Sequence, residues 1–277
     1  MLSEKELYDI KQLQDTCEKA DHIQLKLNWE MLKERGSNIL DFFHYEGDAL
    51  AGYLAIYPFG KKYEISGMVH TDFRRKGIFS ELFRKAIVNM PENAKEILIN
   101  APANSDSAKQ WLQKYPAVYD FSEYQMQWHD TSLESKNFAH VKIREANSAD
   151  LETKIRLDVK CFGFDEAGAR EFNQENVKNH KKSSYMIEVN EEIIGKIGIM
   201  RDEEETYIYG FAIFPESQGK GYGRTALTKT VLAESDAGKT IVLEVAAENK
   251  NALKLYENCG FKSYEVQDYY SYPVKGE

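Results

Sequence analysis

Apolar and polar positions follow two different periods along this chain, and the switches between them predict helices and strands in turn. Segments 3–20 and 148–162 carry apolar residues at helical spacing, so each predicts an amphipathic helix. Segments 49–57 and 192–200 alternate with a period of two beside the turn sequences EGDA and VNEE, which predicts strands joined by hairpins. Strands flanked by helices indicate an α/β layer architecture.

The same order of segments occurs twice. Segment 97–115 (ILINAPANSDSAKQWLQKY) aligns with segment 241–259 (IVLEVAAENKNALKLYENC) at a displacement of 241 − 97 = 144 residues. Gly52 and Gly195 are displaced by 195 − 52 = 143, so only one residue of length changes between these landmarks. A nearly constant displacement over separated blocks predicts an internal repeat.

We therefore expect two copies of one domain, residues 1–134 and 138–277, joined by the polar linker HDTSLESKN (129–137). In each copy a turn and a helix follow the hairpin strands. A buried strand, a second helix and a tyrosine-rich strand pair then close the copy. The tyrosines at 269, 270 and 272 suit strand positions, and a groove lined by them is the alternative.

A glycine-rich turn in the second copy indicates an anion site. The apolar run YIYGFAIF (207–214) predicts a buried strand, and the sequence GRTALTKTVLAE (223–234) predicts a helix. Glycines at 219, 221 and 223 lie between them or at the helix start. The first N–H groups of a helix lack partners and the helix dipole adds partial positive charge, so this order favours a pyrophosphate.

Three other interpretations of the turn are weaker. GYGRTA (221–226) fits a dinucleotide fingerprint, with Glu244 following Ala226 by 244 − 226 = 18 residues, although several residues separate it from the strand. AESDAGKT (233–240) fits a loose phosphate loop, but it leaves a helix and enters a strand, which is the reverse of the required order. A turn with a purely structural role is the third alternative.

Two motifs of the second copy resemble the GNAT superfamily of acyl-CoA N-acyltransferases. QGKGYG (218–223) is similar to its pyrophosphate motif, Q/R-x-x-G-x-G/A. Asn-x-x-Ala (249–252), Leu-Tyr (255–256) and Gly-Phe (260–261) follow in the order of its strand–helix signature. The resemblance covers the chain from about residue 140. It implies two tandem GNAT-like domains, each a mixed, mostly antiparallel sheet flanked by helices.

The resemblance also implies an activity and a donor site. It implies transfer of an acetyl group from acetyl-CoA to a small-molecule or peptide amine, by direct attack in a ternary complex and without a metal. A non-catalytic module that binds acyl-CoA or a partner is the alternative. Asn249 either contacts the pantetheine or caps a helix. The full set of implied donor-binding residues is Ala212, Ile213, Gln218, Gly219, Lys220, Gly221, Tyr222, Gly223, Arg224 and Asn249.

Glu244 and Tyr256 are the implied catalytic pair, twelve residues apart. Tyr256 occupies the family position of the acid that protonates the departing thiolate; packing on the sheet is its structural alternative. Glu244 stands in the apolar strand IVLEV, where burial would make it a better base, and a salt-bridged carboxylate is its alternative. A base matters more for alkyl amines, because neutralising one at pH 7 costs about 4–5 kcal/mol, against about 1 kcal/mol for an α-amine.

The first copy departs from these motifs. Its turn reads RRKGIF (74–79), with Phe79 where a small residue is expected, and Asn100 replaces Glu244. We expect a degenerate copy that supports the acceptor site, with retained coenzyme A binding as the alternative. The acceptor-lining segment implied by the family is 161–176, where Asp165 and Glu166 belong to an acidic set.

Composition narrows the setting of the chain. The net charge of −9 disfavours nucleic acid as a partner and mildly favours cationic small molecules. Three scattered cysteines without a CxxC pair, and six histidines without an HExxH pattern, predict neither disulfides nor a metal. The charged start and the lack of an apolar run of about 18 residues predict no signal peptide and no membrane span, so we expect a cytoplasmic protein.

Overall fold

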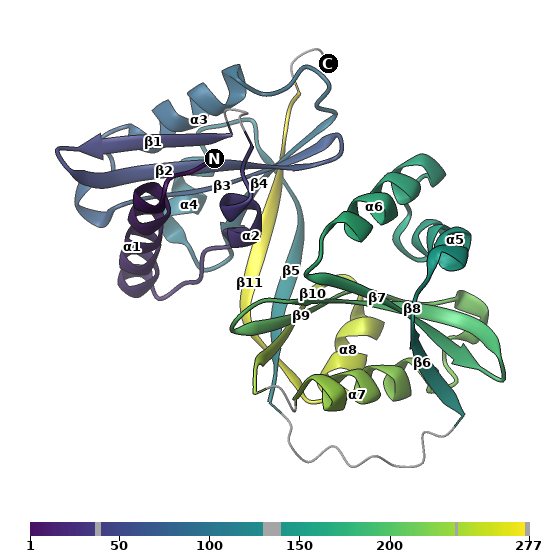
Figure 1. Cartoon of the computed structure of the whole chain (residues 1–277). Coiled ribbons are helices and arrows are strands. Elements are labelled where there is room, and N and C mark those ends of the chain that lie inside the picture. Colours follow the sequence, from purple (N-terminus) through teal and green to yellow (C-terminus); the bar gives the residue numbers. More distant parts are fainter. Residues whose placement is uncertain (37–39, 130–139, 236–237, 275–277) are drawn as a thin grey trace. The chain divides into compact units, whose positions relative to one another are not determined.

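The computed structural model of the chain describes residues 1–36, 40–129, 140–235 and 238–274. The chain divides into two compact units, one formed by residues 1–123 and 265–277 and the other by residues 124–264. Strands β5 (Val118–Trp128) and β11 (Phe261–Tyr272) each run from one unit into the other (Figure 1). The boundary expected at 134–138 lies outside the described residues.

The first unit is built on a sheet in the order β1-β2-β3-β4-β11-β5. The pairs β1–β2, β2–β3 and β4–β11 are antiparallel, and β3–β4 is parallel. Its remaining elements are α1 (Glu4–Asp21), α2 (Trp29–Lys33), β1 (Asp41–Glu46), β2 (Ala49–Phe59), β3 (Lys62–Val69), η1 (Thr71–Phe73), α3 (Ile78–Val88), β4 (Glu96–Pro102) and α4 (Asp106–Leu112).

The second unit contains a sheet in the order β5-β10-β9-β8-β7-β6. The pairs β6–β7, β7–β8 and β8–β9 are antiparallel, and β9–β10 is parallel. Its elements are β6 (Val141–Glu145), η2 (Ser148–Asp150), α5 (Leu151–Phe162), α6 (Glu166–Lys178), β7 (Lys182–Val189), β8 (Glu192–Arg201), β9 (Glu205–Ile213), η3 (Pro215–Ser217), α7 (Tyr222–Ser235), β10 (Thr240–Ala246) and α8 (Lys250–Asn258).

Local sequence accounts for several boundaries. Helix α1 begins at a capping box, in which Ser3 Oγ accepts from the Glu6 amide and the Glu6 carboxylate accepts from the Ser3 amide. The expected hairpin turns are present: β1 and β2 join through Gly47, and β7 and β8 join through Asn190 and Glu191, all with positive φ. The mixed, mostly antiparallel sheets flanked by helices confirm the predicted fold class.

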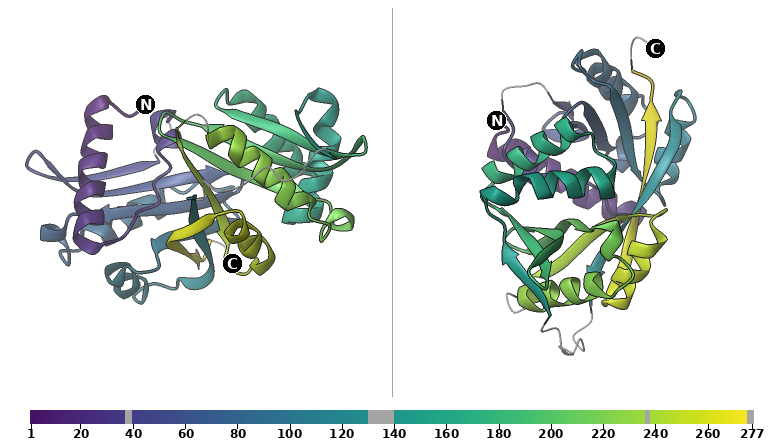
Figure 2. Two further views of the ribbon diagram at one scale, coloured as in Figure 1. Left: turned by 90° about the horizontal axis from the view of Figure 1, so that it is seen from below. Right: turned by 90° about the vertical axis from the view of Figure 1, so that its right-hand side faces the viewer.

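Helices cover both faces of each sheet, because successive strand residues point to opposite sides. In the first unit Tyr53, Ala55 and Tyr57 pack with α1 and α2, whereas Leu54 and Ile56 belong to the core under α3 and α4. In the second unit α5 and α6 lie on one face of the sheet and α7 and α8 on the other (Figure 2).

The last strand of the chain completes the sheet of the first unit, which differs from the expected strand pair. Each copy ends in one long strand, β5 or β11, and residues 267–272 of β11 pair antiparallel with residues 97–102 of β4. Tyr269 is only 1% exposed there, its ring stacks on Phe121 at 4.5 Å, and its hydroxyl donates to Glu123 Oε2 at 2.8 Å. The tyrosine at 269 is therefore core, and the groove interpretation fails for it.

Replacing Tyr269 with alanine should destabilise the protein by about 3–5 kcal/mol, because it removes a buried aromatic ring and leaves a cavity. Urea denaturation of the full chain measures the change, with Tyr8→Ala as the control because Tyr8 is 63% exposed on α1. Equal, small losses in the two variants would show that β11 contributes little to the first unit.

Candidate functional site

A β-bulge interrupts strand β9 of the second unit. Gly198 faces Tyr209 and Lys196 faces Ala212, so the single residue Ile197 lies opposite both Gly210 and Phe211. Gly210 has φ +55°, a conformation that glycine adopts at little cost. A bulge leaves one residue out of the regular hydrogen-bond ladder and turns the strand locally.

The corresponding strand of the first unit has no bulge. Ala55, Leu54 and Tyr53 of β2 pair in unbroken order with Ser66, Gly67 and Met68 of β3. Below the bulge the pairs Ile56–Ile65 and Ile199–Ile208 are displaced by 143 residues, whereas the strand ends Val69 and Ile213 are displaced by 144. The extra residue in the second copy is therefore the bulge itself.

Strands β9 and β10 also separate at this point. Among the described residues their parallel ladder runs from Glu205–Thr240 to Ile208–Leu243 and goes no further. The main chain of β9 from Tyr209 onward thus has no ladder partner in β10. The signal that could have located this feature was Gly210, an isolated glycine inside a strand pattern.

The predicted donor-binding residues Ala212 and Ile213 form the buried end of β9. Gln218 Nε2 donates to the Ile213 carbonyl at 2.8 Å, and Cys161 Sγ lies 3.5 Å from the same oxygen. The first unit repeats both contacts at Val69, as described next. What this strand end can still offer a ligand is main chain other than that carbonyl.

Arg74 Nε donates to the Val69 carbonyl at 3.0 Å, and Cys17 Sγ lies 3.4 Å from it. Cys17 and Cys161 are displaced by 161 − 17 = 144 residues, as are Arg74 and Gln218. The two cysteines are thus equivalent positions of the repeat, a relation that the sequence comparison missed. Both copies hold the strand end before the turn in the same way.

The turn after β9 has the geometry of an anion cradle. Gly219 and Gly221 have φ +74° and +82°, and a Cβ atom added to either would meet no atom within 4 Å. Backbone conformation therefore requires these glycines, and the space beside them is open. The Thr225 amide donates to the Gly221 carbonyl at 3.0 Å, which starts α7. The preceding N–H groups remain at the helix start.

The other turn residues divide between packing and exposed charge. A Cβ on Gly223 would lie 3.6 to 3.7 Å from Ile213, Leu255 and Phe211, so its small size serves packing within α7. Tyr222 is half-buried at the start of α7. Lys220 and Arg224 are exposed, and neither makes an ion pair within the described part of the chain.

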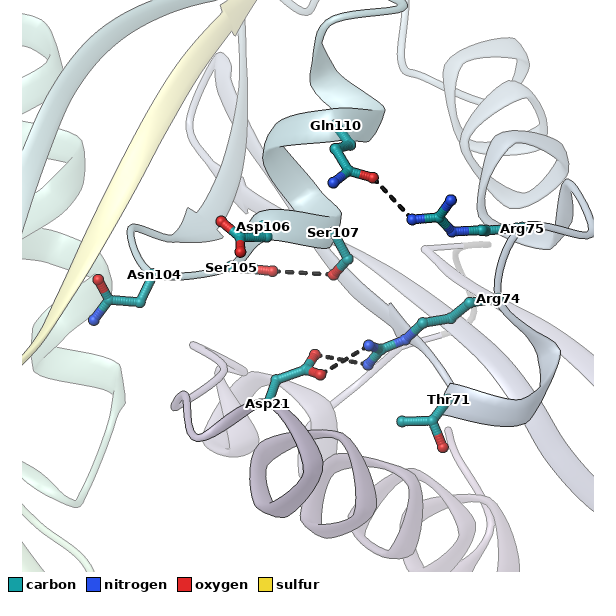
Figure 3. A pocket seen from close by; sticks show the side chains of 9 residues that line it. All are labelled: Asp21, Thr71, Arg74, Arg75, Asn104, Ser105, Asp106, Ser107 and Gln110. Carbon is teal, nitrogen blue, oxygen red and sulfur yellow. Dashed lines mark hydrogen bonds and ion pairs between the residues drawn. The ribbon is translucent and has the colours of Figure 1, made fainter.

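The equivalent turn of the first unit keeps the backbone but occupies its cations. Arg75 and Gly77 have φ +63° and +85°, matching Gly219 and Gly221. The Arg74 guanidinium forms a two-point ion pair with Asp21 at 2.8 and 2.7 Å, and Arg75 donates to Gln110 Oε1 at 3.1 Å (Figure 3). These contacts surround a cavity of about 440 Å³.

Aromatic packing fills the helix start of that unit. Phe79, at the position of Gly223, meets Trp111 edge-on at 4.7 Å. Trp111 occupies the position of Leu255, because 255 − 111 = 144. The first unit therefore keeps the fold of the turn while its charges and space are committed to internal contacts.

The predicted pair Glu244 and Tyr256 lies on opposite faces of the second sheet. Glu244 is half-buried and accepts hydrogen bonds from the Tyr207 hydroxyl at 3.0 Å and from Gln125 Nε2 at 3.2 Å. Its strand neighbours Leu243 and Val245 point the other way, into the core under α7 and α8. The Glu244 carboxylate is thus on the face covered by α5 and α6.

Tyr256 belongs to that opposite core, on α8. It is 8% exposed and its ring lies 6.1 Å from the ring of Phe261. Burial raises the pKa of Tyr256 to about 12. Asn249 caps the same helix, because its Oδ1 accepts from the Ala252 amide at 3.1 Å.

A cavity of about 630 Å³ opens on the face covered by α5 and α6. It reaches the bulge, since Tyr209 and Gly210 line it together with Lys196 of β8. The expected segment 161–176 contributes to it through Phe172 and Asn173. Its acidic residues are used elsewhere: Asp165 caps α6 and Glu166 lies 3.5 Å from Arg170.

A buried ion pair supports the wall of this cavity. Asp158, on α5, is fully buried; Lys196 Nζ contacts its Oδ1, and Asn173 Nδ2 donates to its Oδ2 at 2.7 Å. Burial lowers the pKa of Lys196, although Asp158 opposes this change. The pair joins β8 to both helices of the acceptor-facing layer.

Two further searches gave negative findings for the described residues. None of their helices combines the length and apolar character needed to cross a bilayer. They also contain no group of three or more His, Cys, Asp or Glu side chains arranged to hold a metal ion.

Comparison with known proteins identifies the repeat. The family model described as the acetyltransferase (GNAT) family matches twice, over residues 5–114 and 149–261. A [ribosomal protein bS18]-alanine N-acetyltransferase of Haemophilus influenzae is 31% identical over 105 residues, which are 36% of this chain and 71% of that protein.

Other relatives match over shorter parts of their length. An uncharacterized N-acetyltransferase of Bacillus subtilis, YycN, is 34% identical over 30% of this chain and 56% of its own. The spermidine N(1)-acetyltransferase of Vibrio cholerae is 40% identical over 24% of this chain and 42% of its own. The match thus spans about half the length of these two relatives.

Solved structures match the whole tandem fold. A GCN5-related N-acetyltransferase from Sphaerobacter thermophilus superposes with a TM-score of 0.76 at 15% identity, covering 96% of this chain and 92% of that one. A tandem GNAT protein from the clavulanic acid biosynthesis pathway has a TM-score of 0.69 at 12% identity, covering 98% and 95%. With the family model matched in both copies, the chain belongs to the GNAT acetyltransferase family.

Proposed function

We propose that the second unit transfers an acetyl group from acetyl-CoA to an amine by direct attack in a ternary complex. The observation that carries the proposal is the bulge at Gly210, because it opens the main chain of β9 beside the glycine turn and the cavity. The donor would then reach from the turn to the bulge, and the acceptor would enter from the cavity.

The turn suits the diphosphate of the donor. Its two positive-φ glycines leave open space beside the backbone, and Lys220 and Arg224 add exposed positive charge. A helix N-terminus favours a phosphate through its unpaired amides and its dipole. Ala212, Ile213 and Asn249 flank the path expected for the pantetheine.

The bulge suits the thioester. When the amine nitrogen attacks, the carbonyl oxygen gains negative charge, and main-chain amides held in place before the reaction stabilise that charge. Such amides need no reorganisation at the moment of transfer. The separated end of β9 is the part of the second unit that can supply them.

Glu244 would accept the proton that the amine must lose, directly or through water. Tyr207 and Gln125 hold its carboxylate on the face where the cavity lies. The new C–N bond forms as the C–S bond breaks, and the amine proton passes to this carboxylate. Its value is greatest for an alkyl amine, whose neutralisation costs about 4–5 kcal/mol at pH 7.

Tyr256 would serve the leaving sulfur. With a pKa of about 12 it stays protonated at neutral pH, so it can donate a hydrogen bond to the thiolate. Complete transfer to a thiolate of pKa about 8.5 would be uphill by about 5 kcal/mol. We therefore assign Tyr256 to stabilising the departing anion, which takes its proton fully once the donor site opens to water.

The first unit would play a supporting part. Its strand β3 is regular where β9 is bulged, and its turn cations are held by Asp21 and Gln110. A second site for the donor is therefore not part of the proposal.

Deleting Gly210 should convert the β8–β9 pairing to the regular register of β2–β3 and close the opening. We expect acetyl-CoA affinity to fall at least about tenfold, or about 1.4 kcal/mol, with loss of turnover. Calorimetric titration and coenzyme A release measure the two effects. Cooperative thermal unfolding of the variant checks its folding, and normal binding in a folded variant would contradict the proposal.

Gly221→Ala tests the turn without changing chain length. Alanine at φ +82° costs about 1–2 kcal/mol and displaces the amides at the start of α7, so acetyl-CoA should bind several-fold more weakly. Gly47→Ala is the matched control, since Gly47 has φ +61° and equally open surroundings in a hairpin of the first unit. Equal acetyl-CoA affinity in both variants would remove the turn from the donor site.

Glu244→Gln and Tyr256→Phe test the chemical roles. Each should lower kcat about 10²–10⁴-fold, the usual contribution of acid–base catalysis, while acetyl-CoA affinity changes little. Raising the pH should partly restore Glu244→Gln, because a neutral amine needs no base. A folded protein that binds acetyl-CoA yet acetylates no member of an amine and peptide panel would instead indicate a non-catalytic acyl-CoA-binding module.

A further inference from the structure

The cavity beside the bulge is positively lined in an acidic protein. Its charged lining residues are four lysines and one glutamate, whereas the whole chain carries a net charge of −9. These residues are Glu145, Lys154, Lys178, Lys182 and Lys196. A cavity of this sign opposes the entry of a polycation and attracts an anionic group.

Lys154 stands out because the acids beside it are already engaged. It lies on α5 one turn from Asp150 and one turn from Asp158. Asp150 accepts two hydrogen bonds from Arg144, both at 2.8 Å, and a third from the Asn147 amide at 2.8 Å. Asp158 is held by Lys196 and Asn173.

The Lys154 ammonium is consequently a buried charge in need of an anion. The residue is 6% exposed and lines the cavity, and among the described residues its Nζ makes no hydrogen bond or ion pair. Burial lowers the pKa of Lys154, although Asp150 and Asp158 oppose that change. An unpaired buried charge lowers stability, and it persists where a ligand supplies the partner.

We infer that this cavity binds a carboxylate of the amine acceptor, with Lys154 as its counter-ion. The inference rests on the proposed function, since the same cavity reaches Gly210 and Tyr209 at the bulge. A molecule bearing both groups can therefore place its carboxylate at Lys154 and its amine toward the thioester. The acceptor class is an amino acid or a related amino carboxylate.

The surroundings favour a carboxylate over a phosphate or a polyamine. Arg144, the guanidinium near this wall, is fully occupied by Asp150 and Glu188, so one free ammonium faces one anionic charge. Lys182 donates to Asn176 at 3.2 Å and lies 5.6 Å from the Tyr209 ring, which adds positive charge near the bulge. The acidic character of the whole chain is thus a poor guide to its acceptor.

Coenzyme A release with matched acceptors tests the inference. The panel pairs amino acids with their carboxamides and adds spermidine and an aminoalkyl phosphate. We expect the wild-type protein to prefer carboxylates at least about tenfold in kcat/KM. Lys154→Met should abolish that preference by raising KM for carboxylates alone, and Lys154→Arg should keep most of it. Preference for amides, spermidine or the phosphate overturns the inference and leaves the proposed function standing.

A second measurement does not depend on turnover. Lys154→Met should raise the thermal midpoint of the unliganded protein, because it removes an uncompensated buried charge. N-acetylated amino acids should stabilise the wild-type protein, whereas their amides and the Lys154→Met variant should show no such shift. Lys160→Met is the control, because Lys160 lies exposed on the same helix, 3.6 Å from Glu216.

The two hypotheses can fail separately. Absence of acetyl-CoA-dependent turnover with every amine refutes the acetyltransferase proposal, and the thermal titrations then decide the carboxylate site alone. A lower midpoint in Lys154→Met, as expected when an internal ion pair is lost, would overturn the inference, as would equal stabilisation by acids and amides.

Discussion

One additional residue in strand β9 is the constraint on which the rest of the second unit depends. A regular ladder would use every main-chain group between β8 and β9, as the β2–β3 pair does in the first unit. The bulge at Gly210 breaks that ladder where β9 and β10 also separate. The glycine turn, the start of α7 and the cavity under α5 and α6 are all arranged around the opening. Without it they would be a turn, a helix and a hollow with no shared reaction centre.

The two copies show how one fold divides into a working and a supporting form. Both keep the contacts that hold the strand end, through Gln218 and Cys161 in one and Arg74 and Cys17 in the other. The first unit then spends its turn cations on Asp21 and Gln110. The second leaves Lys220 and Arg224 exposed and keeps a buried lysine facing a cavity. Internal pairing favours stability, whereas unpaired charge favours binding at a cost in stability.

Much of the fold could be predicted from the sequence because it follows from local patterns. The period of apolar residues indicated α1 and α5, the turn residues marked the hairpins, and a displacement of 144 residues revealed the repeat. The glycine turn was visible because positive φ restricts the residue type. The bulge was not, although the displacement of 143 recorded it, because its position depends on which residues pair across two strands. The exchange of β11 between the units and the isolation of Lys154 likewise depend on distant partners.

The most direct test of this account is a crystal structure of the protein with acetyl-CoA bound. The account predicts the diphosphate at the turn of residues 218–224 and the thioester oxygen within hydrogen-bond distance of a main-chain amide at the β9 bulge. Density for the donor in the first unit alone, or in the second unit with its thioester away from residues 210–213, would contradict it.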